Sequence, residues 1–117
     1  MIIAVDFDGT LCKNAWPDIG EPRDGVIRYL KHRQRNGDKL ILWTNRTGER
    51  LEDAVKWCKG QGLTFDAVNG NIPEIVQQYG WDCRKVYADV YLDDKAMKPE
   101  DAERQGRFVR TVRRGMP

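Results

Sequence analysis

Two carboxylates spaced two residues apart stand directly after an apolar run at the start of the chain. Asp6 and Asp8 follow Met1 to Val5, and Gly9 comes next. In an extended chain, residues i and i+2 point to the same side, so the two acids can share one site. Acids held that close repel each other unless a cation or a shared proton relieves them. This spacing alone leaves two interpretations open, a magnesium-type oxygen site or a strand that ends in a solvated acidic turn.

Two further apolar segments end in polar residues that such a site would use. One ends in Thr44 and continues into Asn45, and the other ends in Asp93 and Asp94. If the three segments are neighbouring strands of one parallel sheet, their carboxyl ends meet in one crevice, which is where ligands bind in such sheets. Because three polar ends would converge there, we expect a metal site rather than an acidic turn.

Carboxylates, a hydroxyl and a lysine around Mg²⁺ predict phosphoryl-transfer chemistry. The positive charge allows one carboxylate to approach a phosphate and attack phosphorus, which forms an aspartyl-phosphate. A second carboxylate on the same face can protonate the leaving oxygen and later take a proton from the hydrolytic water. The Thr44 hydroxyl and backbone N–H groups can hold the phosphate oxygens, and a lysine can neutralise the remaining charge.

Strand and helix patterns alternate along the chain, which predicts an α/β fold with a mainly parallel sheet and helices on both faces. Apolar runs predict strands at residues 1–5, 39–44, 63–68 and 86–92, and helical periodicity predicts helices at 25–36, 48–59 and 73–79. The Pro and Gly content of residues 11–22 predicts an irregular loop, which follows the first acids and could cover their site.

Composition limits the classes of protein to consider. The chain has 117 residues, a size typical of one domain, and its net charge of +2 does not require a polyanionic or membrane partner. No apolar run approaches the roughly 20 residues of a membrane span. The three cysteines lack a metal-binding or disulfide pattern, so we expect reduced thiols and a cytoplasmic protein. His32 is the only histidine, so carboxylates must carry any acid–base chemistry.

Three segments, in this order, resemble the motifs of the haloacid dehalogenase (HAD) superfamily of phosphotransferases. Residues 6–11 (DFDGTL) resemble its first motif, residues 40–44 (LILWT) its second, and residues 91–94 (YLDD) its acidic fourth. The resemblance covers residues 1 to about 96 and implies a three-layer α/β/α sandwich with a Rossmann-like sheet. It also implies a magnesium-dependent phosphomonoester hydrolase.

Residue roles follow from the resemblance by position. Asp6 would be the nucleophile and Asp8 the general acid/base, and Thr44 would bind phosphate. Asp93 and Asp94 would hold Mg²⁺ together with Asp6 and the backbone carbonyl of Asp8.

The lysine of the superfamily's third motif has no clear counterpart in this chain. Lys85 is our choice for phosphate binding, although it reaches the site only if the last strand is short, about 90–92. Lys95 and Lys98 are the alternatives. Near the second motif, Asn45 is expected to position Asp8 or the phosphate, while Arg46 could meet phosphate or face solvent.

The chain leaves no room for an inserted cap domain, so it resembles the small capless members of the superfamily. We expect one domain, with a catalytic core at about 1–98 and a basic tail at about 99–117. An arginine stripe in the tail would favour a nucleic-acid end as substrate, and its alternative is a solvated basic tail. The stripe comprises Arg104, Arg107, Arg110, Arg113 and Arg114. A nucleic-acid end-processing phosphatase and a non-catalytic phospho-ligand binding module are the competing functions, and the substrate itself stays open.

Overall fold

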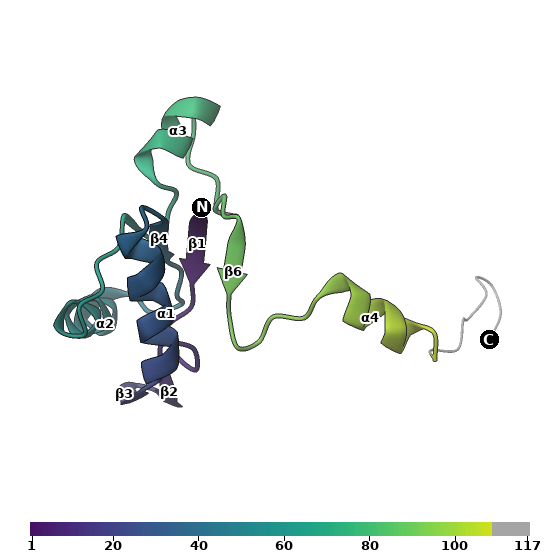
Figure 1. Cartoon of the computed structure of the whole chain (residues 1–117), viewed down its shortest axis with the longest axis horizontal. Coiled ribbons are helices and arrows are strands. Elements are labelled where there is room, and N and C mark those ends of the chain that lie inside the picture. The colour runs from purple at the N-terminus through teal and green to yellow at the C-terminus, as the bar shows by residue number, and fades with distance from the viewer. Residues whose placement is uncertain (109–117) are drawn as a thin grey trace.

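A four-stranded parallel sheet forms the centre of the computed structural model, which describes residues 1–108 (Figure 1). Its strand order is β5-β4-β1-β6. The strands are β1 (Ile2–Val5), β4 (Lys39–Leu42), β5 (Ala67–Val68) and β6 (Val90–Leu92). The register aligns Val5 with both Leu42 and Leu92, so three strands end at the same level. The α/β class and the parallel sheet predicted from the sequence are confirmed.

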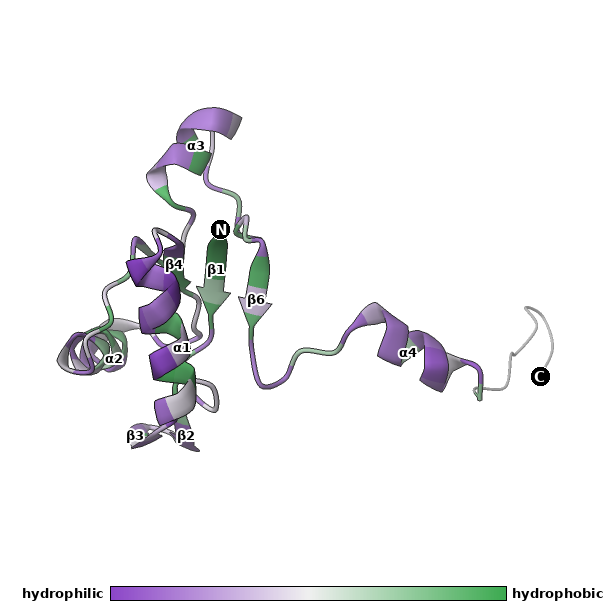
Figure 2. Ribbon diagram, viewed as in Figure 1, coloured by the Kyte–Doolittle hydropathy of each residue, from purple (hydrophilic) through white to green (hydrophobic). Residues whose placement is uncertain are grey.

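Helices α1 (Asp24–Arg35) and α2 (Gly48–Gly60) follow the first two strands of the sheet and bury one of its faces. Their inner residues, among them Leu30 and Ala54, form a single core with Ile3, Val5 and Leu42. Strand β1 is green in Figure 2, whereas much of α1 is hydrophilic. This burial is what fixes the position of the strand ends.

The opposite face of the sheet has a smaller core. Ala4 and Ile41 point to this face and pack with Ile72 and Val86, which lie on either side of α3 (Pro73–Tyr79) in the sequence. The predicted bounds of α3 agree with the structure, and Pro73 occupies its first turn, where a missing N–H costs no hydrogen bond.

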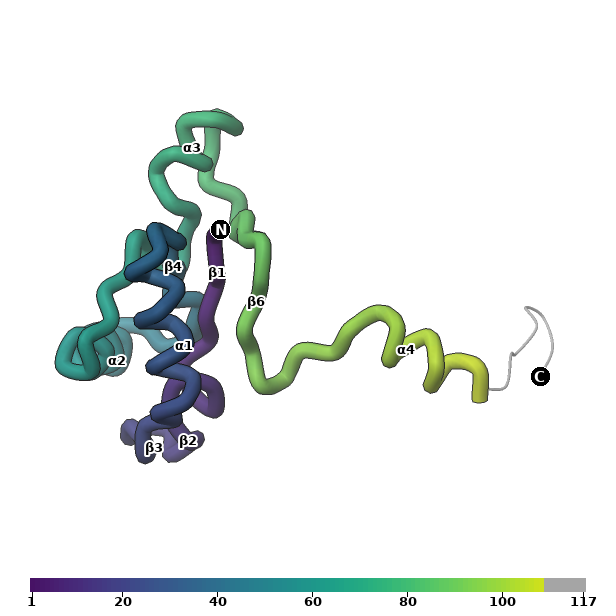
Figure 3. Tube along the Cα trace, viewed as in Figure 1, coloured from purple at the N-terminus to yellow at the C-terminus, as the bar shows by residue number. Residues whose placement is uncertain are grey.

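Residues 11–22, predicted to be an irregular loop, instead form an antiparallel hairpin of β2 (Cys12–Ala15) and β3 (Asp18–Pro22). Ala15 pairs with Asp18, so Trp16 and Pro17 make a two-residue turn. The residues that suggested a loop have specific places in the hairpin. Pro17 is in the turn, Pro22 ends β3, and Gly20 lies where the two strands approach closely. The hairpin lies at the end of the sheet toward which β1 points (Figure 3).

The remaining differences from the predictions are in the lengths of the elements. The second, third and last predicted strands are shorter than expected, because only the residues beside β1 or β4 pair regularly. Helix α4 (Pro99–Gly106) was not predicted, and it extends away from the sheet without a buried residue (Figure 1). None of the helices within residues 1–108 is long and apolar enough to cross a membrane.

Candidate metal and phosphate site

The polar residues that follow β4, β1 and β6 lie side by side at the carboxyl edge of the sheet. Backbone pairing continues one residue beyond the strands. The Asp6 N–H donates to the Leu92 carbonyl at 2.9 Å, and the Trp43 N–H donates to the Val5 carbonyl at 2.8 Å. The prediction that these three strand ends are neighbours is therefore confirmed.

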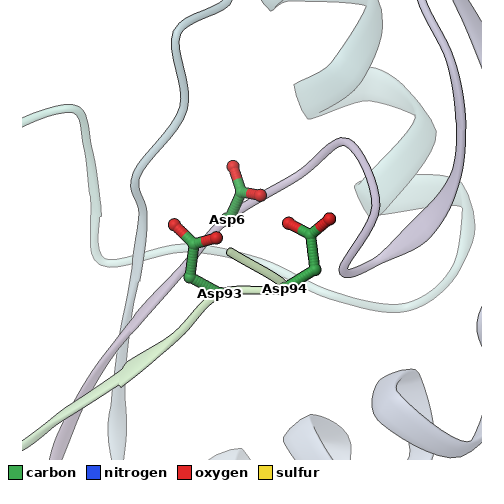
Figure 4. Close-up of side chains that lie close together, drawn as sticks. All are labelled: Asp6, Asp93 and Asp94. Atoms are coloured by element: carbon green, nitrogen blue, oxygen red, sulfur yellow. The ribbon is translucent and has the colours of Figure 1, made fainter. Parts of the chain in front are cut away.

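Asp6, Asp93 and Asp94 bring their carboxylates together at this edge, and all three project toward the same space (Figure 4). One oxygen from each lies within 4.8 Å of the others. Asp6 is partly buried, and burial, followed by the charge of Asp93, raises its pKa from 3.8 to about 6. Such mutual repulsion is what a bound cation relieves.

Gly9 and Thr10 hold Asp94 in this cluster. The Asp94 N–H donates to the Thr10 hydroxyl oxygen at 3.0 Å, and that buried hydroxyl also lies 3.4 Å from an oxygen of Asp6. Gly9 has a φ of +88°, and a Cβ atom at this position would overlap the Asp94 carboxylate. The glycine after the two acids is therefore required by both the turn and the close approach of Asp94.

Thr44 presents a hydroxyl beside the acids. Its N–H donates to the Asn69 side-chain oxygen at 2.8 Å, and its own oxygen accepts from the Arg46 N–H at 3.1 Å. The hydroxyl proton therefore stays available to a ligand. A cavity of about 520 Å³ opens here, lined by Asp6, Trp43, Thr44, Asn45, Asn69, Arg84 and Asp93.

Asp8 is held by a residue that the sequence analysis did not connect to it. Arg46 donates from Nε and Nη2 to the two Asp8 carboxylate oxygens at 2.8 and 2.7 Å. Arg46 is 1% exposed, so it neither faces solvent nor meets phosphate. Its hydrogen bond to Asp8 raises its pKa above the ordinary value. Asn45, expected to position Asp8 or the phosphate, lines the cavity with Asp6 and Thr44, and its role stays a prediction.

Asp8 stands beside the three-acid cluster rather than within it. It lines a smaller cavity of about 160 Å³ together with Asp6 and the hairpin residue Asn14. The expected contact between the backbone carbonyl of Asp8 and Mg²⁺ stays a prediction.

Lys85 is not brought to the acids. It lines a separate cavity of about 370 Å³ with aromatic residues that include Tyr79 and Trp81. Strand β6 is as short as the prediction required, but the chain before it still runs back along β1, where the Asp89 N–H donates to the Ile2 carbonyl at 2.8 Å. Lys85 therefore lies toward the amino end of the sheet.

Other cations are near the acids. Lys95 lines the smaller cavity beside Asp6, and Arg84 lines the larger one. Lys98 lies farther along the chain, directly before α4. Of the predicted arginine stripe, Arg104 and Arg107 are in or next to α4, and the rest lies outside the described residues.

Sequence reasoning missed Asn69 and Arg84 as parts of this site, and it placed Arg46 near the site without its pairing with Asp8. Arg46 could have been found from its position two residues after Thr44. Asn69 could have been found because it begins an Asn-Gly pair, which is typical of a turn. Arg84 carried no signal beyond being next to Lys85.

A conserved protein from Bacteroides thetaiotaomicron has a solved structure similar to this one. Its sequence is 42% identical, the TM-score is 0.74, and the match covers 83% of this chain and 78% of that chain. This chain belongs to the same family as that conserved protein. Membership in this family supports the α/β fold, and the chemistry has to be argued from the side chains. No protein-family model and no curated protein matches the chain.

Proposed function

We propose that this protein is a magnesium-dependent phosphomonoester hydrolase that works through an aspartyl-phosphate on Asp6. The observation that carries the proposal is that Asp6, Asp93 and Thr44 line one cavity at the carboxyl edge of a parallel sheet. Carboxylates beside a hydroxyl donor can serve a metal and a phosphate at once.

The proposal extends to the fold family. With α1 and α2 on one face and α3 on the other, the chain fits a three-layer, capless member of the HAD superfamily. Between β1 and α1 there is only the small hairpin β2–β3, and between β4 and β6 there are only α2, β5 and α3. The site would then be open to bulky phosphoesters.

The donor set fits Mg²⁺. Asp6, Asp93 and Asp94 offer carboxylate oxygens within 4.8 Å of one another, and oxygen ligands are those that Mg²⁺ prefers. Burial and the charge of Asp93 both raise the pKa of Asp6, and a cation bound beside these acids would oppose that effect. When bound, the ion would neutralise the acids and draw negative charge away from the phosphate oxygens.

Residues of the chain account for each bond change. An Asp6 oxygen attacks phosphorus, the bond from phosphorus to the ester oxygen breaks, and Asp8 gives that oxygen its proton. Water then attacks phosphorus and gives a proton to Asp8, while the bond to Asp6 breaks and phosphate leaves. The Thr44 hydroxyl donates to a phosphate oxygen in both steps. Lys95 or Arg84, rather than Lys85, supplies the neutralising side chain.

One observation favours a second candidate, a phospho-ligand binding module without turnover. Both carboxylate oxygens of Asp8 accept hydrogen bonds from Arg46, so the edge of the carboxylate that faces the guanidinium is not open to a leaving group. If the opposite edge does not reach the leaving group, the site binds phosphate without transferring it.

Hydrolysis of an aryl phosphate by wild type and two variants tests the proposal. We expect magnesium-dependent turnover by wild type, loss of at least a hundredfold in Asp6→Asn, and unchanged turnover in Glu103→Gln, a control on α4. Circular dichroism checks that each variant is folded. Chelator-resistant turnover, or full turnover by Asp6→Asn, contradicts the proposal. Magnesium-dependent phosphate binding without turnover favours the binding module.

A further inference from the structure

Arg46 is the largest fully buried side chain in the described part of the molecule, and it makes more polar contacts than its link to Asp8 requires. Its Nη2 donates to the Asp18 carbonyl at 2.9 Å, and its Nη1 lies 3.3 Å from the Pro17 carbonyl and 3.4 Å from the Arg50 carbonyl. One guanidinium thus joins Asp8 to the turn of the β2–β3 hairpin and to the first turn of α2.

Two aromatic rings enclose this guanidinium. Its carbon lies 4.9 Å from the ring centroid of Phe7, in the core, and 4.9 Å from that of Trp16, at the hairpin turn. Cations over aromatic faces gain attraction and lose access to water. Trp16 is 57% exposed, so it acts as an outer cover for a buried charge.

The hairpin held in this way also reaches the acids. Its Asn14 lines the small cavity that contains Asp6 and Asp8. A shift of the hairpin would therefore move a wall of the cavity and the partners of Arg46 together.

We propose that Arg46 is a positioning residue that sets the orientation of the Asp8 carboxylate relative to the leaving group. This role rests on the proposed phosphatase function. Lysine cannot replace arginine here, because an ammonium group cannot bridge two carboxylate oxygens and three carbonyls in fixed directions.

Leaving-group dependence separates positioning of Asp8 from general support of the fold. The first step breaks the bond from phosphorus to the ester oxygen, and an alkoxide leaving group needs the Asp8 proton, whereas 2,4-dinitrophenolate leaves without it. Misplacement of Asp8 therefore reduces kcat/KM for an alkyl phosphate and spares 2,4-dinitrophenyl phosphate. A destabilised fold would reduce both equally.

The experiment measures kcat/KM of the full chain with Mg²⁺ for both substrates in Arg46→Lys, Asp8→Asn and the double variant. We expect Arg46→Lys to lose about tenfold or more with the alkyl phosphate and less than threefold with the dinitrophenyl ester. Because Arg46 acts through Asp8, the double variant should lose no more than Asp8→Asn alone. Arg28→Lys, an exposed change on α1, is the matched control.

The outcomes separate this role from the proposed function. No hydrolysis of either substrate by wild type overturns the proposed function and this role with it. Wild-type hydrolysis with equal losses in Arg46→Lys, or with additive losses in the double variant, overturns the positioning role alone. If Arg46→Lys does not fold, Trp16→Leu tests the positioning role in its place. Trp16 is exposed, so its replacement uncovers the Arg46 guanidinium without a change in the core. A loss confined to the alkyl phosphate supports the role, and no change overturns it.

Discussion

Burial and the charge of Asp93 raise the pKa of Asp6 from 3.8 to about 6, so the folded protein without metal holds a proton there more tightly than the unfolded chain does. The stability that this proton contributes is present below pH 3.8 and is lost as pH rises through about 6. A bound cation would reverse this preference, because it favours the ionised carboxylate.

This linkage predicts a pH-dependent effect of Asp6→Asn on stability. In the presence of chelator, the variant should gain stability relative to wild type by about 1–2 kcal/mol as the pH rises from 4 to 7.5. This gain is smaller than the whole pKa shift would give, because Asp6 is partly exposed and solvent screens its charge. Urea denaturation at several pH values measures the difference, with Glu103→Gln as control. A difference that does not change with pH would contradict the assigned environment of Asp6.

Residues at strand ends were predictable, whereas their partners were not. Asp6, Asp93 and Thr44 could be placed because parallel strands bring their carboxyl ends together. Arg46 could not, because its role depends on carbonyls of a hairpin that was expected to be a loop. Lys85 was expected near the acids if the last strand was short. That expectation was wrong, because the length of a strand does not show at which end of the sheet the preceding residues lie.

The β2–β3 hairpin is the element that most changes the account of the site. Pro17, Gly20 and Pro22 each suggest a turn or loop when read singly, and together they concealed two short strands. The strand pairing shows why glycine stands at position 20: a Cβ atom there would overlap the Lys13 carbonyl across the hairpin.

Gly20→Ala and Gly60→Ala should therefore have opposite effects. The first should destabilise the protein by about 1–3 kcal/mol, because backbone on the partner strand has to move. The second places alanine in α2 with no atom within 4 Å of the new Cβ, and should be neutral or stabilising by up to about 1 kcal/mol. Thermal or urea denaturation of both variants tests this. Equal effects would contradict the hairpin geometry.

At the scale of the whole molecule, helix α4 is distinct from the folded body formed around the sheet. The two cores contain residues from Ile2 to Leu92, and α4 beyond them buries no side chain. Figure 3 shows α4 standing apart from the sheet. The predicted division near residue 98 stays a prediction.

A chain that ends after Lys98 should therefore be as stable as the full chain to within about 0.5 kcal/mol. It should also hydrolyse a small aryl phosphate at the same rate, because the acids and Thr44 lie before the cut. Urea denaturation and turnover of both chains measure this. A loss of stability above about 2 kcal/mol would show that the C-terminal part packs against the body.

The central claim is that phosphorus becomes bonded to Asp6 during turnover. Borohydride reduces an acyl phosphate but not a free carboxylate, so it marks the nucleophile. After wild type is mixed with substrate and Mg²⁺ and quenched with borohydride, mass spectrometry should find Asp6 reduced to homoserine. The omission of Mg²⁺ should abolish this reduction, and Asp8 should stay unreduced. Turnover with no reduction at Asp6, or with reduction at another acid, would contradict the account.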